Sequence, residues 1–439
     1  MPSPRLRNSS PLTQTLKELE DRQETRIELG LSRVLKVLGR LGNPHLGLPC
    51  IHVAGTNGKG SVCAILEAVL REAGYKTGFY HSPHLFDVRE RIRNNGRWIS
   101  KASFARLMSR VLEADKGKNL TYFELLTLVA FLHFREKKVD VAILETGLGG
   151  RLDATNVIEN PLAAVISSID FDHTQFLGNT LEEISAEKAG IIKPGCPVLC
   201  SVLAESALKV VRDRAHKLSA PLTVVGKPHK ALSVNWRSGR QVFEDSRGLR
   251  YTLGLLGSHQ GFNAALARAT LDQLHSILPV CDLVWRSGTA NVSWPGRFEA
   301  RHLGLKTVIL DGAHNLEAMR QLARTWDKSP WANEKCLWIL GLMRDKDVSG
   351  VLREISGRLR DVVVVRPPSP RAMEPLSLAR QVRRRVPSAH VSVERDPGTA
   401  IKDWLGRRGS PRVAVICGSF YLVGEAYKHL RGGGSGPKP

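Results

Sequence analysis

The stretch IHVAGTNGKGS, residues 51–61, decides the fold prediction, because an apolar run leads directly into a glycine-rich turn. Residues 50–54 predict a strand, and the apolar segment 61–73 predicts a helix. A strand that enters a helix through such a turn directs several backbone N–H groups to one point, where the positive helix end also attracts an anion. The stretch therefore predicts a phosphate-binding loop rather than a plain glycine turn, although its spacing is shorter than that of G-x-x-x-x-G-K-[ST].

Short apolar runs alternate with amphipathic stretches beyond this loop. Further strands are predicted at 139–145, 162–169 and 197–201, and helices at 16–41, 103–114, 122–136, 181–189, 205–218 and 263–277. Such alternation predicts a mainly parallel sheet with helices on both faces. The more irregular segment 222–256 predicts antiparallel strands.

The alternating pattern starts again after the Gly/Ser/Pro-containing segment 287–296. Strands are predicted at 306–311, 335–340, 361–366, 390–394 and 412–417, with helices at 316–326, 348–359, 375–385, 398–405 and 424–430. Since 439 residues also exceed the usual size of one core, we expect two α/β domains, 1–290 and 296–439. The glycine-rich tail 432–439 is expected to be flexible.

The composition indicates a soluble globular protein in a reducing compartment. No segment reaches the roughly 18 apolar residues of a membrane span. The seven cysteines are odd in number and contain no C-x-x-C pair, which argues against a disulfide framework or a zinc ribbon. Residues 1–17 lack the apolar core of a secretion signal. We therefore expect a cytoplasmic protein that does not bind membranes.

The charge of the chain is strongly positive. Lysine and arginine outnumber aspartate and glutamate 64 to 42, which gives a net charge of +22. This charge would suit nucleic acid, an anionic membrane or strongly anionic small molecules, and composition alone does not choose among them. The basic run 383–385 has no interleaved aromatic residues, so a solvated helix face is the favoured interpretation.

Acidic and histidine side chains stand at the ends of two predicted strands. Glu145 ends the strand 139–145, and His173 follows the strand 162–169. Taken singly, each would be an ordinary solvated residue at a strand end. Because an open α/β sheet binds ligands at the carboxyl ends of its strands, both become candidate Mg²⁺ ligands beside the phosphate loop.

Several motifs occur in one order along the chain. They are 55–61, 81–85 with 90–92, 120–124, 149–156, 172–178, 187–193, 259–263, 295–299, 311–315, 345–347 and 418–422. Together they resemble the folylpolyglutamate synthase and dihydrofolate synthase family within the Mur ligase superfamily. The resemblance runs from about residue 29 to residue 425. It implies a Mur-ligase-type domain with a phosphate loop, followed by a smaller Rossmann-like α/β domain.

The resemblance implies ATP-dependent amide formation. L-glutamate would be joined to dihydropteroate, to the γ-carboxylate of reduced folylpolyglutamates, or to both, through an acyl phosphate. Activation is needed because a carboxylate oxygen is a poor leaving group, while Mg²⁺ and basic groups neutralise the charge on the transferring phosphoryl group. The partners implied are small molecules only, with no nucleic acid, and the chain is expected to be a monomer.

The resemblance also assigns residues to ATP and metal. ATP is expected at Gly55, Thr56, Asn57, Gly58, Lys59, Gly60 and Ser61 of the loop, and at Asn263, Arg297 and Asp311. Ser61 and Glu145 would hold one Mg²⁺ and His173 a second, and a monovalent cation is also expected. From the residues alone, Asn263 would be an ordinary helix-start residue and Arg297 a linker charge.

Further residues are assigned to catalysis and to the other substrates. Lys59, Lys188, Asp311 and His314 are the expected catalytic residues. Lys188 matches a lysine that is carbamylated by CO₂ in the family; locally it is an ordinary lysine at a helix end. His314 is equally consistent with an ordinary turn histidine. Substrate contacts are expected from Ser82, Pro83, His84, Phe123, Arg151, Asp153 and Ser419, although Phe123 would also fit an apolar core.

Three other functions remain as alternatives. A cell-wall Mur-type amide ligase would carry a nucleotide-sugar domain before the loop, and only 54 residues precede Gly55. A nucleic-acid-stimulated ATPase with a phosphate loop would explain the net charge and would show salt-dependent polymer binding. A small-molecule kinase would leave a stable phosphorylated product.

Overall fold

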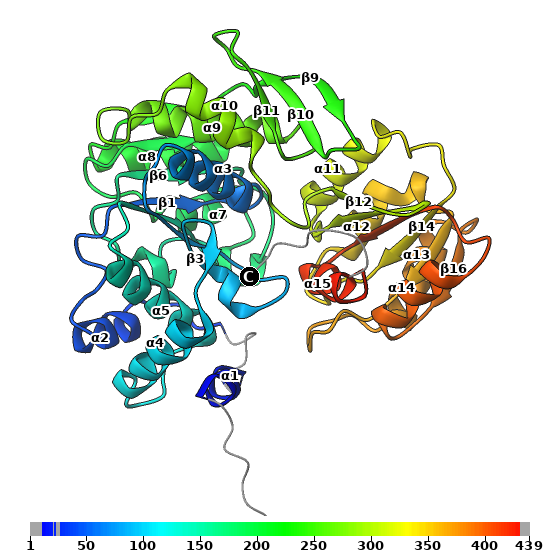
Figure 1. Ribbon diagram of the computed structural model, residues 1–439, viewed down its shortest axis with the longest axis horizontal. Helices are drawn as coiled ribbons and strands as arrows, with labels where there is room; N and C mark the ends of the chain where they lie inside the picture. Colours follow the sequence, from blue (N-terminus) through cyan, green and yellow to red (C-terminus); the bar gives the residue numbers. More distant parts are fainter. Residues whose placement is uncertain (1–10, 21, 23–26, 431–439) are drawn as a thin grey trace, which may run out of the picture.

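The computed structural model describes residues 11–20, 22 and 27–430 (Figure 1). The helix expected over 16–41 is two helices, α1 (Pro11–Glu20) and α2 (Ser32–Arg40). Gly30 lies between them at φ +139°, a backbone conformation that side-chain-bearing residues rarely adopt. Residues 21 and 23–26 of the expected helix, and the tail 432–439, lie outside the described residues.

The first sheet has the order β4-β3-β2-β5-β1-β6-β7-β8 in the described part of the chain. Its strands are β1 (Cys50–Ala54), β2 (Thr77–Tyr80), β3 (Ile92–Asn94), β4 (Arg97–Trp98), β5 (Val141–Glu145), β6 (Ala163–Ile166), β7 (Val198–Cys200) and β8 (Leu222–Val224). All neighbours from β2 to β8 pair in parallel, which confirms the mainly parallel sheet. The short strands β2, β3 and β4 were not predicted. The prediction of antiparallel strands over 222–256 was wrong for β8, which pairs in parallel with β7.

Helices cover both faces of this sheet. They are α3 (Lys59–Glu72), α4 (Lys101–Ala114), α5 (Tyr122–Lys137), α6 (Thr174–Leu177), α7 (Leu181–Ala189), α8 (Glu205–Lys217), α9 (Gln260–Gln273) and α10 (Asp282–Ala290), with 3₁₀ turns η1 (Val88–Arg91) and η2 (Ala154–Val157). Ile51 and Val53 of β1 pack with α3 and α9, whereas Cys50 and Ala54 pack on the opposite face. The alternation along β1 therefore places His52 on the face away from α3.

The second sheet has the order β12-β13-β17-β14-β15-β16. Its strands are β12 (Glu299–Leu303), β13 (Lys306–Asp311), β14 (Cys336–Leu340), β15 (Asp361–Val364), β16 (His390–Val393) and β17 (Val413–Cys417). Its helices are α11 (Leu316–Asp327), α12 (Val348–Ile355), η3 (Ser356–Arg358), α13 (Pro375–Arg385), α14 (Pro397–Gly406) and α15 (Phe420–His429). Only β12, an antiparallel edge strand, was missed. The basic run 383–385 is exposed at the end of α13, as expected of a solvated helix face.

The antiparallel strands expected in 222–256 are β9 (Lys230–Asn235), β10 (Arg240–Glu244) and β11 (Arg250–Leu253). In Figure 1 they lie above the two sheets and reach toward α11. The β9–β10 turn carries Trp236, whose ring centroid lies 6.0 Å from that of Phe298 and 5.9 Å from that of Trp331. We call the residues up to 290 the first unit and those from 296 onward the second unit. A second contact between them is made by Phe86 and Tyr427, whose ring centroids lie 4.6 Å apart. Aromatic packing thus holds the two sheets side by side.

The sequence predicted residues 287–296 as the connection between the two domains. The actual connection is shorter, because α10 continues to Ala290. The large and the three-stranded sheets precede residue 290, and the six-stranded sheet follows residue 298. We keep 1–290 and 296–439 as a proposed division into domains. No helix in the described ranges is long and apolar enough to cross a bilayer.

Candidate active site

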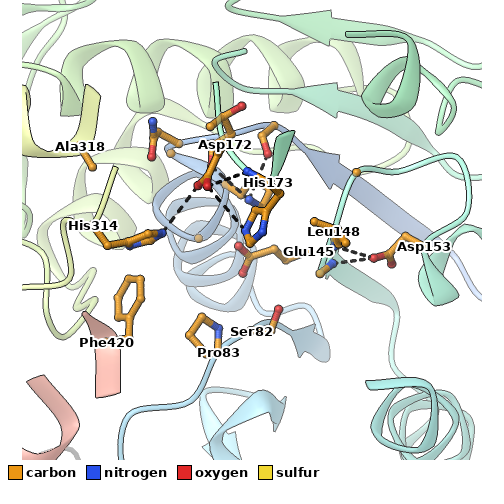
Figure 2. Close-up of a pocket in the computed structure, with 18 of the residues that line it drawn as sticks. Ser82, Pro83, Glu145, Leu148, Asp153, Asp172, His173, His314, Ala318 and Phe420 are labelled. Carbon is orange, nitrogen blue, oxygen red and sulfur yellow. Dashed lines mark hydrogen bonds and ion pairs between the residues drawn. The ribbon is translucent and has the colours of Figure 1, made fainter. Parts of the chain in front are cut away.

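A cavity of about 360 Å³ opens between the two sheets, beside the carboxyl ends of β1, β5 and β13. The first unit contributes the glycine-rich loop, Glu145 and Lys188, and the second contributes Asp311 and His314. Figure 2 shows Glu145 and His173 facing the second unit's His314 and Phe420 across this space. The topology thus brings together residues that lie far apart in the sequence.

The glycine-rich loop has the predicted strand–turn–helix geometry, with β1 before it and α3 after it. Gly55 and Gly58 have φ values of +148° and +86°, and a Cβ at Gly55 would lie 1.9 Å from Ser167 Oγ. The Lys59 ammonium donates hydrogen bonds to the carbonyl oxygens of Gly55 and Thr56 at 3.0 and 3.2 Å. The lysine is therefore held at the mouth of the loop, where a phosphate would meet it.

Lys188 lies against the same loop. It is only 3% exposed, and its Nζ donates to the Gly55 carbonyl oxygen at 2.8 Å. Burial, together with the charge of Lys59, lowers the pKa of Lys188 to about 7. A solvated lysine at the end of a helix does not fit this environment. The amine is instead placed where a large neutral fraction exists near neutral pH.

Glu145, Ser61 and His173 offer donor atoms to a divalent cation. Glu145 is buried and its Oε2 has no hydrogen-bond partner among the described residues, as is also true of His173 Nδ1. Ser61 is buried in the first turn of α3. Burial lowers the pKa of His173 to about 3, so its ring is neutral. No group of three or more His, Cys, Asp or Glu side chains in the described part of the chain could hold a metal. The donor set still fits Mg²⁺, which takes few protein ligands and completes its shell with water and phosphate oxygens.

The Glu145 carboxyl should make stability depend on pH. Burial raises its pKa from 4.5 to about 7, against the opposing effect of Lys59 and Arg297. The folded protein therefore binds more protons than the unfolded chain between these pH values, so Glu145 makes the free energy of unfolding fall as pH rises through this window. We expect Glu145→Gln to remove roughly 2–3 kcal/mol of that fall in urea titrations without nucleotide or metal. Glu334→Gln, at an exposed position, is the control, and an unchanged slope in Glu145→Gln would refute the burial argument.

Asp172 joins the two units beside His173. Its Oδ1 lies 2.5 Å from Lys346 Nζ, and its Oδ2 accepts a hydrogen bond from Asn315 Nδ2 at 3.0 Å. The Asn315 amide also donates to Asn57 Oδ1 of the loop at 3.1 Å. Burial alone would raise the pKa of Asp172, but the nearby His314 and Lys346 side chains lower it well below its usual range. The carboxylate thus stays ionised at the junction.

Asp172, Lys346 and Asn315 were not predicted as site residues, although each lies in one of the motifs. The position of Asp172 after β6 was the available signal. Nothing in the sequence pairs it with a lysine 174 residues later. Asn315 also caps α11, since its side-chain oxygen accepts a hydrogen bond from the Ala318 N–H.

The second unit supplies Asp311, His314 and Arg297. Asp311 ends β13, and its carboxylate accepts from the N–H groups of Phe298 and Ala313 at 2.8 and 2.7 Å. His314 Nδ1 donates to the Gly312 carbonyl oxygen at 2.8 Å, and its Nε2 lies 3.7 Å from Asp172 Oδ2. The Arg297 guanidinium lies 4.4 Å from the Phe420 ring centroid. All three line the cavity.

Asn263 lines the cavity beside the glycine-rich loop. It lies inside α9, which begins at Gln260, rather than at the helix start. Its Nδ2 donates to Gln260 Oε1 at 2.8 Å. A Cβ on Gly58 would lie 2.4 Å from its Oδ1, so Asn263 touches the phosphate loop.

The expected substrate residues fall into two groups. Ser82, Pro83, Phe123, Asp153 and Ser419 line the cavity. His84 and Arg151 are not among the lining residues. His84 Nδ1 accepts from Arg91 Nε at 2.9 Å, and Arg91 does line the cavity. Arg151 pairs with Glu187 at 2.7 Å, and its side chain is 57% exposed. The structure therefore brings five of the seven together.

Known proteins share this architecture. Residues 53–271 match the Mur ligase middle domain, and residues 296–420 match the Mur ligase, glutamate ligase domain. The chain is 36% identical over 428 residues to dihydrofolate synthase/folylpolyglutamate synthase of Bacillus subtilis, with 92% of this chain and 96% of that protein covered. It is similar to Escherichia coli FolC in complex with DHPP and ADP, at a TM-score of 0.82 and 33% identity over 96% of this chain and 97% of that one.

A further relative is bifunctional folylpolyglutamate synthase/dihydrofolate synthase from Yersinia pestis, solved in complex with AMPPNP and Mn ion. Its TM-score is 0.80 at 33% identity, and 98% of this chain and 100% of that chain are covered. These similarities extend through both units. The chain therefore belongs to the dihydrofolate synthase/folylpolyglutamate synthase family of Mur ligases.

Proposed function

We propose that this protein is an ATP-dependent ligase that joins L-glutamate to a pteridine carboxylic acid. The acid would be dihydropteroate, the γ-carboxylate of a reduced folylpolyglutamate, or both. The single observation that carries the proposal is the cavity between the sheets, which the glycine-rich loop and Lys188 line together with Asp311 and His314. The names of the relatives, and the ADP, AMPPNP and DHPP present in their structures, support it.

The nucleotide is assigned to the loop and to the residues around it. The loop amides and Lys59 would hold the terminal phosphates, while Asn263 and Arg297 would contact the rest of the nucleotide from α9 and from the start of the second unit. Arg297 and Lys59 are cations near Glu145, and both lower its pKa. They would stabilise the charge that develops on a transferring phosphoryl group.

Ser61 and Glu145 would hold one Mg²⁺, and His173 would contribute to a second. Glu145 Oε2, which no described residue hydrogen-bonds, is the atom best suited to this role, and the Mn ion in the Yersinia pestis relative supports a divalent cation here. Such an ion would neutralise charge on the phosphates during transfer. A monovalent cation remains part of the proposal.

The proposed reaction has two steps. A carboxylate oxygen of the pteridine acid attacks the γ-phosphorus of ATP, and ADP leaves. The glutamate amine then attacks the acyl carbon, inorganic phosphate leaves with the carboxylate oxygen, and the nitrogen loses a proton. We assign the placement of glutamate to His314 and Ser419 and leave Asp311 with the nucleotide and catalysis; all three residues line the cavity.

We also propose that Lys188 is carbamylated. Its neutral amine would attack the carbon of CO₂ and lose one proton, so a buried cation would become an anion beside the loop. Three features support this: the burial of Lys188, its pKa near 7 and its contact with Gly55. The neutral form that CO₂ requires is therefore accessible.

Product analysis tests the proposed function. Purified protein is incubated with Mg·ATP, L-glutamate and either dihydropteroate or tetrahydrofolate, and the products are identified by mass spectrometry. We expect ADP, inorganic phosphate and an acid heavier by one glutamyl residue with at least one substrate. A stable phosphorylated acid without glutamate would indicate a kinase instead, and no product with either acid would refute the proposal.

We propose, finally, that the protein acts as a cytoplasmic monomer. Six of its seven cysteines are buried, and all seven are free, which suits a reducing compartment. Light scattering of the purified protein should give the mass of one chain, 48.4 kDa. A mass of two or more chains at working concentrations would contradict this part of the proposal.

A further inference from the structure

Behind the cavity wall, three buried side chains form a hydrogen-bonded series. His52 Nε2 lies 2.8 Å from Thr155 Oγ1, and Thr155 Oγ1 lies 2.6 Å from Asp153 Oδ1. His52 and Thr155 are completely buried, and Asp153 is 4% exposed. The series begins in the middle of β1, on the face away from α3, and ends at a residue that lines the cavity.

The proton positions in this series follow from its chemistry. An ionised carboxylate only accepts, so Thr155 donates its single hydroxyl proton to Asp153. The hydroxyl oxygen then accepts from His52, which means that Nε2 carries the imidazole proton. Burial and the charge of Lys193 lower the pKa of His52 to about 3, in agreement with a neutral ring. His52 therefore fixes the direction in which the Thr155 hydroxyl points.

The Asp153 carboxylate has no acceptor site left for a substrate. Its Oδ1 also accepts from the Thr155 N–H at 3.0 Å. Its Oδ2 accepts from the N–H groups of Gly147 and Leu148 at 2.8 and 2.9 Å, as Figure 2 shows for Leu148. A carboxylate offers about four acceptor sites, and these four donors fill them. Asp153 thus holds the backbone directly after Glu145.

That backbone shapes the cavity. Gly147, Leu148 and Phe123 all line it. A Cβ on Gly147 would lie 2.6 Å from Phe123 Cζ, so the glycine backbone packs directly on the ring. A shift of the Gly147–Leu148 backbone would therefore move Phe123, which lines the cavity and is one of the residues expected to contact the pteridine acid.

We propose that His52 and Thr155 are positioning residues for the pteridine acid. They act through Asp153, which holds the Gly147–Leu148 backbone against Phe123. That the substrate is a pteridine acid rests on the proposed function. A purely structural role does not explain His52. Its Nδ1 has no partner among the described residues, and an unpaired buried nitrogen is destabilising where an aliphatic side chain would pack without that cost.

Hydrogen exchange tests the network independently of activity. In His52→Leu, the amides of Gly147 and Leu148 should exchange about tenfold faster than in the wild type, since one hydrogen bond of ~1.4 kcal/mol corresponds to a tenfold change. The amides of the loop 55–61 should be unchanged. His52→Gln, whose amide nitrogen reaches the Nε2 position, should restore wild-type exchange. His133→Leu, at another buried histidine with an unpaired Nδ1, is the control. Unchanged exchange at Gly147 and Leu148 in His52→Leu would overturn the proposal.

Kinetics test the consequence for the substrate. His52→Leu should raise the KM for the pteridine acid about tenfold, with the KM for ATP within twofold of wild type and kcat little changed. Thr155→Val should do the same, and the double variant should show no further loss, because both changes break one series. Equal increases in both KM values, or no increase, would overturn the proposal. If His52→Leu does not fold, Thr155→Val decides with the same readouts. If the wild type forms no glutamyl product, the proposed function fails, and the exchange experiment still decides the network.

Discussion

Replacing Lys59 with alanine is expected to reduce kcat/KM by about 10²–10³-fold, the usual cost of removing one group that stabilises transition-state charge. The Lys59 ammonium is held over the Gly55 and Thr56 carbonyl oxygens, where the terminal phosphates of ATP would replace these contacts. Steady-state kinetics with saturating glutamate and pteridine acid measure the loss. Thermal unfolding should change little, because the side chain is only partly buried.

An exposed lysine provides the control for this experiment. Lys36 lies on α2, far along the chain from the loop, and is exposed. Lys36→Ala should keep wild-type kinetics. Turnover in Lys59→Ala within threefold of the wild type would mean that the loop does not bind the reacting phosphates.

Replacing Lys188 with alanine is expected to abolish glutamate incorporation while ATP still binds. The side chain contacts the loop through the Gly55 carbonyl oxygen, but the loop amides and Lys59 remain in the variant. Turnover should fall by about 10²-fold or more, and the Kd for ATP should stay within about threefold. Product formation and calorimetric ATP titration measure the two quantities separately.

The carbamate can be observed directly in the same pair of proteins. With ¹³CO₂, the wild type should give a carbamate carbon resonance that Lys188→Ala lacks. Lys217→Ala, at an exposed lysine of α8, should keep both the resonance and the activity. Wild-type rates in Lys188→Ala would remove the carbamate from the mechanism.

Local patterns predicted the elements that carry the site. The strand, glycine turn and helix around residue 55 lie within one short segment, so periodicity and turn chemistry were sufficient. The same is true of the second unit, where five of the six strands were placed. The strands β2, β3 and β4 have only two to four residues and, unlike the equally short β6 and β7, do not lie in a continuous apolar run. The helix expected at 16–41 is instead two helices, and Gly30, at a φ of +139°, lies just before the second of them.

Contacts between distant segments were beyond the sequence. The pairing of Asp172 with Lys346 exists only because the two units pack together. The hydrogen bonds that fill the acceptor sites of Asp153 likewise depend on the tertiary structure, because they come from the backbone N–H groups of Gly147 and Leu148. The resemblance predicted that Asp153 contacts the substrate. The structure shows that its acceptor sites are already occupied by hydrogen bonds within the protein. A resemblance to a family can therefore predict which residues belong to the site, but the contacts of each residue come from the structure.

Transfer of oxygen from the acid to phosphate tests the central claim most directly. Dihydropteroate or tetrahydrofolate, whichever the protein uses, is labelled with ¹⁸O in the reacting carboxylate and incubated with Mg·ATP and L-glutamate. If the acid is activated as an acyl phosphate, the released inorganic phosphate will contain one ¹⁸O atom per amide formed. Amide formation with unlabelled phosphate would contradict the account.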